Sequence, residues 1–183
     1  MKDVLICDRA GIIYEGDENL NEAQKEIAKM TNKARLKGTL KDAMVGADVF
    51  IGVSGPNCVS QEMIKSMNEK SIVFPLANPV PEINPDLAKE AGAYIIGTGS
   101  SEYANQINNV LVFPGLFRGA IDAKARTINT EMMVAASEGI ASCVSDKELS
   151  RDYILPFPYD RKAHVCVAKA VKEAAIRTGV CKK

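Results

Sequence analysis

Short apolar runs alternate with amphipathic segments along the first hundred residues of the chain. Runs rich in valine, isoleucine and other apolar residues, bounded by turn residues, predict four strands. These strands are residues 3–8, 48–54, 71–77 and 93–97. Capping residues and apolar positions spaced three and four apart predict helices between and after them. These helices are residues 19–33, 39–46, 60–68, 84–92 and, more roughly, 115–125, 128–143 and 163–178.

The alternation of strand and helix predicts an α/β fold. Short strands without a polar face are typical of a parallel sheet covered by helices on both faces, the doubly wound Rossmann-like arrangement. Its connections are expected to be right-handed crossovers. We therefore divide the chain into strands and crossover helices at about 1–112 and a helical tail at about 113–183. The sequence leaves open whether this tail packs on the sheet or on a partner.

Composition excludes several classes of protein. The 183 residues, 46% of them hydrophobic and 25% charged, are enough for one globular domain. Basic and acidic residues balance at 23 each, and no basic run exceeds two residues, so no nucleic-acid partner is expected. The five cysteines are widely spaced and form no C-x-x-C pair, which favours reduced thiols in the cytoplasm. No apolar run approaches membrane-spanning length, so no membrane association is expected.

One residue near the start of the chain fits a nucleotide-binding role. In a dinucleotide-binding fold a strand, a glycine-rich turn and a helix precede a second strand that ends in an acidic residue. Asp8 ends the first apolar run and could accept both ribose hydroxyls of adenosine, although a solvated strand end is the commoner explanation for such an acid. No residue before Asp8 supplies G-x-G-x-x-G. The first, central strand and its glycine-rich turn are therefore expected to be missing, and to come from a longer polypeptide or a separate piece.

Three segments carry a family resemblance: ADVFIGVSGPN at 47–57, VFPLANPVPEI at 73–83 and GTGSSEYANQINNVLVFPGLFRGAIDAKA at 97–125. Together they resemble the C-terminal NAD(P)-binding domain of bacterial-type malic enzymes, beginning at its second strand. The resemblance implies oxidation of malate at C2 with NAD or NADP, followed by loss of carbon dioxide to give pyruvate. It also implies a divalent metal, Mg²⁺ or Mn²⁺, and a homo-oligomer, a dimer or larger.

The resemblance assigns roles to three asparagines. It implies that Asn78 contacts the cofactor near the nicotinamide, and that Asn109 contacts the carboxylate end of malate. Asn108 lies beside the nicotinamide or supports the loop, and the choice between Asn108 and Asn109 as the malate contact stays open. From the residues alone, Asn78 follows a buried strand, and bonding to its own turn backbone is the commoner role of such an asparagine; the flanking motif favours the cofactor site.

Other candidate cofactor contacts lie after the first and second predicted strands. Ser54 and Gly55 form a loop whose backbone can approach a phosphate or ribose closely, although a plain strand-to-helix turn is as good an interpretation. Arg9 could contact the 2′-phosphate of NADP. Asp8 would repel that phosphate and favours NAD.

No catalytic residue and no metal ligand is assigned within the chain. In the family, a tyrosine, a lysine and carboxylate metal ligands precede the missing glycine-rich turn, so a missing N-terminal catalytic domain is expected to supply them and to hold the metal. His164, the only histidine, begins a predicted helix and is expected to be a surface or capping residue rather than a catalytic one. The alternative is a non-catalytic nucleotide-binding or structural fragment of a larger assembly. Shikimate and methylene-tetrahydrofolate dehydrogenases fit less well, because they lack NQINNVLVFPG.

Overall fold

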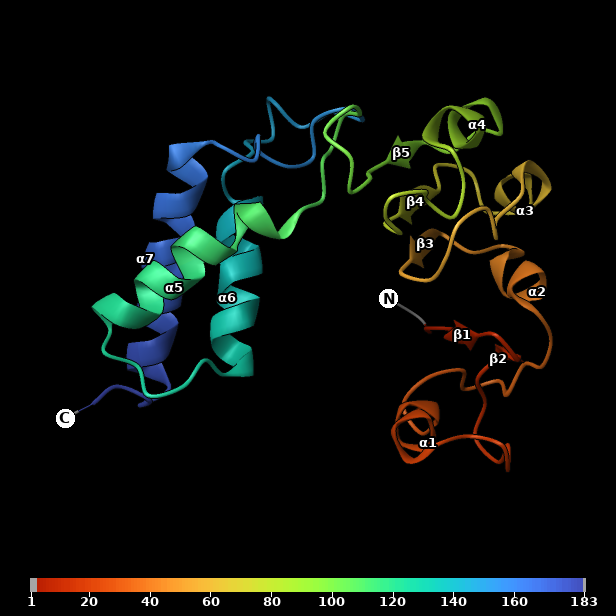
Figure 1. The fold of residues 1–183 in the computed structure, drawn as a ribbon, viewed down its shortest axis with the longest axis horizontal. Coiled ribbons are helices and arrows are strands. Elements are labelled where there is room, and N and C mark those ends of the chain that lie inside the picture. The colour runs from red at the N-terminus through yellow and green to blue at the C-terminus, as the bar shows by residue number, and fades with distance from the viewer. Residues whose placement is uncertain (1–2, 183) are drawn as a thin grey trace.

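The computed structural model describes residues 3–182, which form a sheet-containing part and a helical part side by side (Figure 1). Three parallel strands form the main sheet in the order β3-β4-β5. They are β3 (Val49–Gly52), β4 (Ile72–Pro75) and β5 (Ile95–Ile96). Val49 pairs with Ile72, and Val73 with Ile96. The predicted second, third and fourth strands are therefore confirmed, each somewhat shorter than expected.

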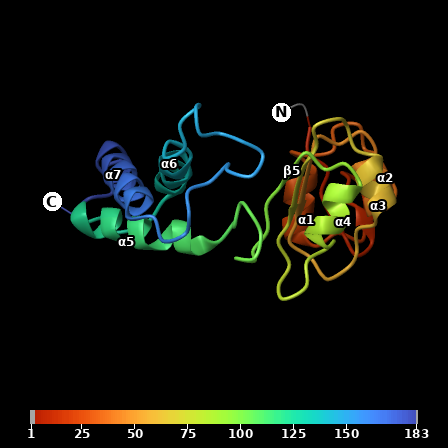
Figure 2. The same cartoon turned by 90° about the horizontal axis from the view of Figure 1, so that it is seen from above.

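Three short helices connect and flank these strands: α2 (Leu40–Met44), α3 (Gln61–Lys65) and α4 (Pro85–Glu90). Each follows a residue that bonds its first turn: Ser60 and Asn84 accept backbone N–H groups there, whereas the N–H and hydroxyl of Thr39 donate to the carboxylate in the first turn of α2. Figures 1 and 2 show all three on the same side of the sheet. Their apolar side chains close over the buried face of the strands, and this core includes Phe50, Ile64 and Val73.

The second face of β3 differs from the expectation of helices on both faces. Side chains alternate along a strand, and here Phe50 and Gly52 are buried whereas Val49 and Ile51 are 47% and 61% exposed. Within residues 3–182 no helix covers these two side chains. The edge strand β3 therefore presents two β-branched side chains on an exposed face.

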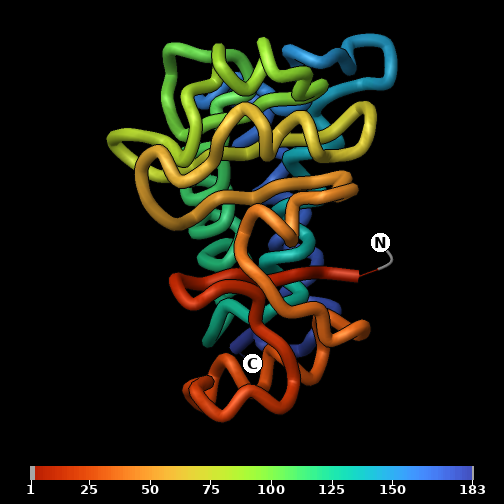
Figure 3. Tube along the Cα trace, turned by 90° about the vertical axis from the view of Figure 1, so that its right-hand side faces the viewer, coloured from red at the N-terminus to blue at the C-terminus, as the bar shows by residue number. Residues whose placement is uncertain are grey.

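The first predicted strand is wrong in extent, burial and partner. Only Cys7–Asp8 (β1) is extended, and it pairs antiparallel with β2 (Gly11–Ile12) in a separate two-stranded sheet. None of residues 3–8 is buried. The tight turn depends on Gly11, whose φ is +119° and at which a Cβ would collide with the carbonyl oxygen of Gly38. Figure 3 shows this hairpin below β3, β4 and β5, which follow in chain order.

The first helix is also shorter than predicted. α1 (Glu22–Ala28) begins after Asn21 rather than Asn19, because Asn21 and Gln24 exchange side-chain bonds with each other's backbone at 2.9 Å. Asn19 instead donates to the carboxylate of Asp17. The helix ends well before residue 33. Asn32, 1% exposed with φ +50°, turns the chain there.

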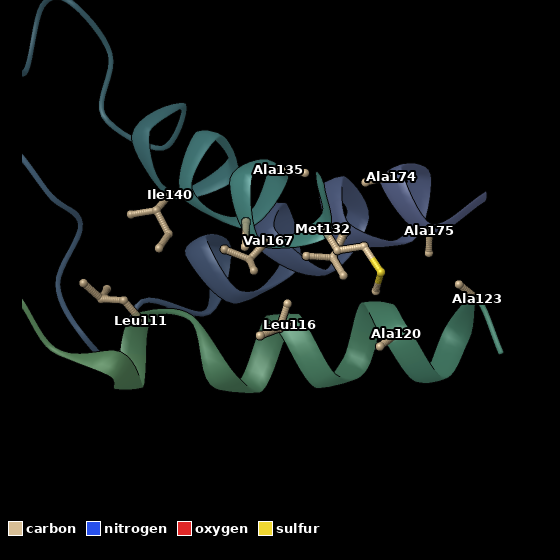
Figure 4. Packing of buried hydrophobic residues seen from close by; sticks show 12 residues of the cluster. Leu111, Leu116, Ala120, Ala123, Met132, Ala135, Ile140, Val167, Ala174 and Ala175 are labelled. Atoms are coloured by element: carbon tan, nitrogen blue, oxygen red, sulfur yellow. The ribbon is translucent and has the colours of Figure 1, made fainter. Parts of the chain in front are cut away.

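The helical tail packs on itself. After η1 (Asn109–Leu111) come α5 (Phe113–Asp122), α6 (Thr130–Ala141) and α7 (Arg161–Arg177). Figure 4 shows the inward faces of the three helices meeting in a core separate from that of the sheet. Its members include Leu116, Met132, Val167 and Val171, the last three with no exposed surface. In the part of the chain that the structure describes, no helix is long and apolar enough to cross a membrane.

Candidate functional site

The candidate site lies at the carboxyl ends of the parallel strands. β3 ends at Gly52 and leads to Ser54, and β4 ends at Pro75 and leads to Asn78. Because β3 and β4 are paired in parallel, both loops leave the same edge of the sheet. Ligands of open α/β sheets bind in this place, outside the carboxyl ends of the strands.

A buried carboxylate joins these two loops. Glu82 has no exposed surface, and one of its oxygens accepts the backbone N–H of Ser54 at 2.7 Å and the Ser54 hydroxyl at 3.1 Å. Its other oxygen accepts the backbone N–H of Ala77 at 3.1 Å. The loops after β3 and β4 are therefore tied together through one side chain that lies 28 residues after Ser54.

Asn78 lies against the loop that follows β5. It is exposed, and a Cβ built on Gly99 would come within 2.9 Å of its side-chain nitrogen, so the glycine makes room for the amide. A pocket of about 150 Å³ separates the two loops. Its lining includes Pro75, Ala77, Asn78, Thr98, Gly99 and Tyr103. The pocket places the Asn78 amide where a small polar group can reach it.

Part of the loop after β3 already forms hydrogen bonds within the protein. Both the N–H and the hydroxyl of Ser54 are used by Glu82, so this residue reaches a ligand only by sharing those bonds. Gly55 has open space, since an added Cβ would meet nothing within 4 Å. A side chain would therefore fit at position 55, and packing does not explain the glycine. A glycine there would allow a ligand to approach the backbone closely.

Asn108 and Asn109 differ in what they already bind. Asn108 caps η1, where its side-chain oxygen accepts the N–H of Val110 at 3.0 Å. Asn109 is exposed, and within residues 3–182 its side chain makes no hydrogen bond. Both the oxygen and the NH2 group of the Asn109 side chain are thus free, whereas Asn108 supports the loop through its oxygen and keeps only its NH2 group free.

Asp8 is the last residue of β1, and Arg9 begins the turn that leads to β2. The two oxygens of Asp8 accept the N–H of Ala10 at 2.8 Å and the amide of Gln24 at 2.6 Å. Arg9 is exposed and forms no ion pair with any described residue. Asp8 and Arg9 belong to the two-stranded sheet, whereas Ser54 and Asn78 follow strands of the three-stranded sheet. In the described chain no hydrogen bond joins Asp8 or Arg9 to Ser54 or Asn78.

Three residues of this region were not anticipated as important: Glu82, Gly99 and Asn105. Asn105 is 7% exposed and links the end of β5 to the segment before α7, as its side chain bonds Ile96, Arg151 and Ile154. A sequence signal existed for two of them. Glu82 is an acid that follows P-V-P and precedes an isoleucine, and Gly99 is the second glycine of a G-T-G that follows an apolar run.

Acid–base and metal chemistry find little support among the described residues. Residues 3–182 contain no group of three or more His, Cys, Asp or Glu side chains that could hold a metal ion. His164 is half-buried, and within the described chain its Nε2 is buried without a hydrogen-bond partner. It lies in the first turn of α7, in the helical part of the molecule.

Comparisons with known proteins show which family this chain resembles. Residues 1–176 match the family model described as malic enzyme, NAD binding domain. The chain is 52% identical to the bifunctional malic/malolactic enzyme of Bacillus subtilis, over all of this chain and 45% of that protein. It is 44% identical to the NADP-dependent malic enzyme of Escherichia coli, over 97% of this chain and 25% of that protein. The chain thus spans less than half the length of these relatives.

A solved structure shows the same fold. The crystal structure of the NAD-dependent malic enzyme from Thermotoga maritima matches with a TM-score of 0.86 and 47% identity, over 93% of this chain and 45% of that one. The α/β fold and the family resemblance inferred from residues 47–125 are thereby confirmed. The chain belongs to the family of malic enzyme NAD-binding domains.

Proposed function

We propose that this chain is the cofactor-binding part of an NAD(P)-dependent malic enzyme. That enzyme would oxidise the C2 hydroxyl of malate by hydride transfer to the nicotinamide and release carbon dioxide to give pyruvate. The observation that carries the proposal is the match of the whole chain to part of longer malic enzymes. The loops at the carboxyl edge of the sheet, which contain the family-like segments, support it.

The residues present fit a nicotinamide cofactor. Asn78 offers a neutral amide at the pocket, which can hold a ribose or carboxamide without changing the local charge. Gly55 leaves its backbone open to a phosphate or ribose, with Ser54 beside it. Asn108 would shape the loop next to the nicotinamide. Asn109 would donate to a carboxylate of malate and orient C2 toward the cofactor, whose nicotinamide accepts the hydride when bound.

The proposed preference for NAD over NADP rests on Asp8 and Arg9. Asp8 would accept the ribose hydroxyls of NAD and repel the 2′-phosphate of NADP, whereas Arg9 would attract that phosphate. The acidic residue ends the strand directly and is already oriented by two hydrogen bonds, so NAD is the proposed cofactor. Replacing Asp8 with asparagine should narrow the preference for NAD over NADP.

The metal ligands and the acid–base groups of the proposed reaction are assigned to a domain outside this chain. A divalent metal, Mg²⁺ or Mn²⁺, would polarise the carbonyl of the oxidised intermediate, with ligands and the acid–base pair coming from a catalytic domain. The uncovered face of β3 supports a further protein segment packed on this sheet. A cytoplasmic homo-oligomer, a dimer or larger, completes the proposal.

The test uses the full-length polypeptide that contains this chain. With malate and Mn²⁺ or Mg²⁺ it should reduce NAD or NADP and release carbon dioxide in equal amounts. Asn109→Ala should raise the malate KM or lower kcat by about tenfold, as expected for one lost bond to a charged group. Asn68→Ala is the matched control, because Asn68 is an exposed asparagine just ahead of β4 that bonds Asp48 at the amino end of the sheet.

Two outcomes would contradict the proposal. A wild-type protein that binds a nicotinamide cofactor but never turns over malate would favour the non-catalytic alternative. Equal kinetics for Asn109→Ala and the control would remove Asn109 from the malate site.

A further inference from the structure

Glu82 is an unusual side chain for the interior of this protein. A carboxylate without exposed surface is costly unless its oxygens are satisfied, and here no Lys, Arg or His of the described residues lies within ion-pair distance. All three of its side-chain hydrogen bonds go to the loops after β3 and β4. Within residues 3–182 the carboxylate of Glu82 therefore bonds only the two loops at the carboxyl edge of the sheet.

The bonding pattern requires a carboxylate in particular. One oxygen of Glu82 accepts two donors from Ser54, and the other accepts the N–H of Ala77. A glutamine has one acceptor oxygen, so its amide group would face one of these N–H groups donor to donor. Shortening the side chain to aspartate would draw the carboxylate away from at least one of the loops.

The neighbouring strand is adapted to this side chain. A Cβ on Gly52, the last residue of β3, would lie 2.5 Å from the carboxyl carbon of Glu82 and 2.8 Å from both of its oxygens. The absence of a side chain at position 52 thus leaves room for the acid. The backbone N–H of Val59 also donates to the Glu82 carbonyl at 3.0 Å, which fixes the position from which the side chain extends.

We propose that Glu82 is a positioning residue for cofactor binding, which holds the Ser54–Gly55 loop and the Ala77–Asn78 loop in one relative geometry before the cofactor arrives. The inference rests on the proposed function, because those loops carry the candidate cofactor contacts. A site that is already ordered avoids the entropy cost of ordering two loops on binding. The residue acts through the loops and touches neither malate nor the reacting atoms.

The first test is Glu82→Gln in the full-length polypeptide. Its Kd for NAD⁺ and for NADH should rise about tenfold, whereas kcat at saturating cofactor should stay within about twofold. Gly52→Ala, which displaces the acid from the other side, should give the same signature. In the double variant the two effects on Kd should be less than additive, because both act on one contact.

Asn129→Ala is the matched control for loss of a polar contact. Asn129 caps α6 and bonds Thr178, so its loss should lower the melting temperature and leave the cofactor Kd unchanged. A folded Glu82→Gln protein with wild-type Kd for both cofactors would overturn the proposal. A fall in kcat as large as the loss in cofactor affinity would also overturn the proposal. A residue that only positions the loops for binding should change the cofactor Kd and leave kcat nearly unchanged.

A second measurement needs no variant. In the wild-type protein without cofactor, the backbone N–H groups of Ser54 and Ala77 should exchange with deuterium slowly, because both are held by Glu82 before binding. Exchange as fast as in an unstructured loop would overturn the proposal even if Glu82→Gln fails to fold. A wild-type protein that binds neither NAD⁺ nor NADP⁺ would refute the proposed function, while slow exchange at these two N–H groups would still support the role of Glu82 in fixing the loops.

Discussion

Asn105 is the side chain whose removal should have the clearest structural effect. It lies between the sheet and the helical part, where its amide donates to the carbonyl of Ile96 at 2.9 Å and to that of Arg151 at 2.8 Å. Its oxygen accepts the N–H of Ile154 at 2.8 Å. The guanidinium of Arg151 also lies 3.8 Å from the centre of the Tyr94 ring. Asn105 thus joins β5 to the segment that precedes α7.

The magnitude of the loss follows from these contacts. Asn105→Ala removes three hydrogen bonds from a side chain that is 7% exposed, at about 1 kcal/mol each. The backbone at Asn105 has φ +56°, a left-handed conformation that asparagine tolerates and alanine adopts at a cost of about 1 kcal/mol. The contact between β5 and the segment before α7 should therefore be less stable by about 4 kcal/mol. Asn105→Gly, which has no Cβ, should lose about 1 kcal/mol less.

Hydrogen exchange of the Ile154 N–H in the full-length polypeptide measures this loss locally. A change of about 4 kcal/mol corresponds to roughly a thousandfold faster exchange in Asn105→Ala. The N–H of Ile64, which donates to Ser60 within the sheet core, is the internal control and should change little. Acceleration of less than tenfold at Ile154, or equal values for the alanine and glycine variants, would refute the reasoning.

Two further predictions concern thiol chemistry and helix packing. Burial, and next the neighbouring Cys166 thiol, raise the pKa of the Cys143 thiol to about 11, so only about one molecule in a thousand carries the thiolate at pH 8. Peptide mapping after alkylation should therefore find the exposed Cys58 modified well before Cys143, and equal rates would contradict this. Gly119→Ala should destabilise the packing of α5 on α7 by about 2 kcal/mol despite better helix propensity, because the new Cβ would lie 2.5 Å from a backbone oxygen of α7. Gly139→Ala is the matched control in α6, where the nearest atom is 3.2 Å away, and an equal fall in melting temperature for both would contradict the prediction.

Local signals in the sequence were sufficient for most helices and strands. Ser60 and the Asn84–Pro85 pair begin α3 and α4 as predicted, because a cap bonds the backbone only two or three residues away. The same local physics was ambiguous at α1, where Asn19 and Asn21 both precede acceptable first turns. The fit of Gln24 to Asn21 decided between them.

Residues 3–8 show where a local pattern misleads. The apolar run is as strong as that of β3, yet only Cys7 and Asp8 are extended and neither is buried. A strand in the interior of a parallel sheet is defined by the strands on both sides of it. Hydrophobicity alone cannot supply those neighbours, so the run folds into a hairpin with the residues that follow it.

The sequence by itself determined the α/β class, the family and the loops in which a cofactor site would lie. These depend on runs and motifs whose meaning is contained within a few adjacent residues. Only the tertiary structure decided which polar groups are free for a ligand and which are committed to the fold. The side chains of Glu82 and Asn105 are committed to backbone groups as far as 28 and 49 residues away, whereas the side chain of Asn109 makes no hydrogen bond among the described residues. Such pairings are set by how the strands and helices pack, because two residues far apart in sequence meet only once the chain has folded.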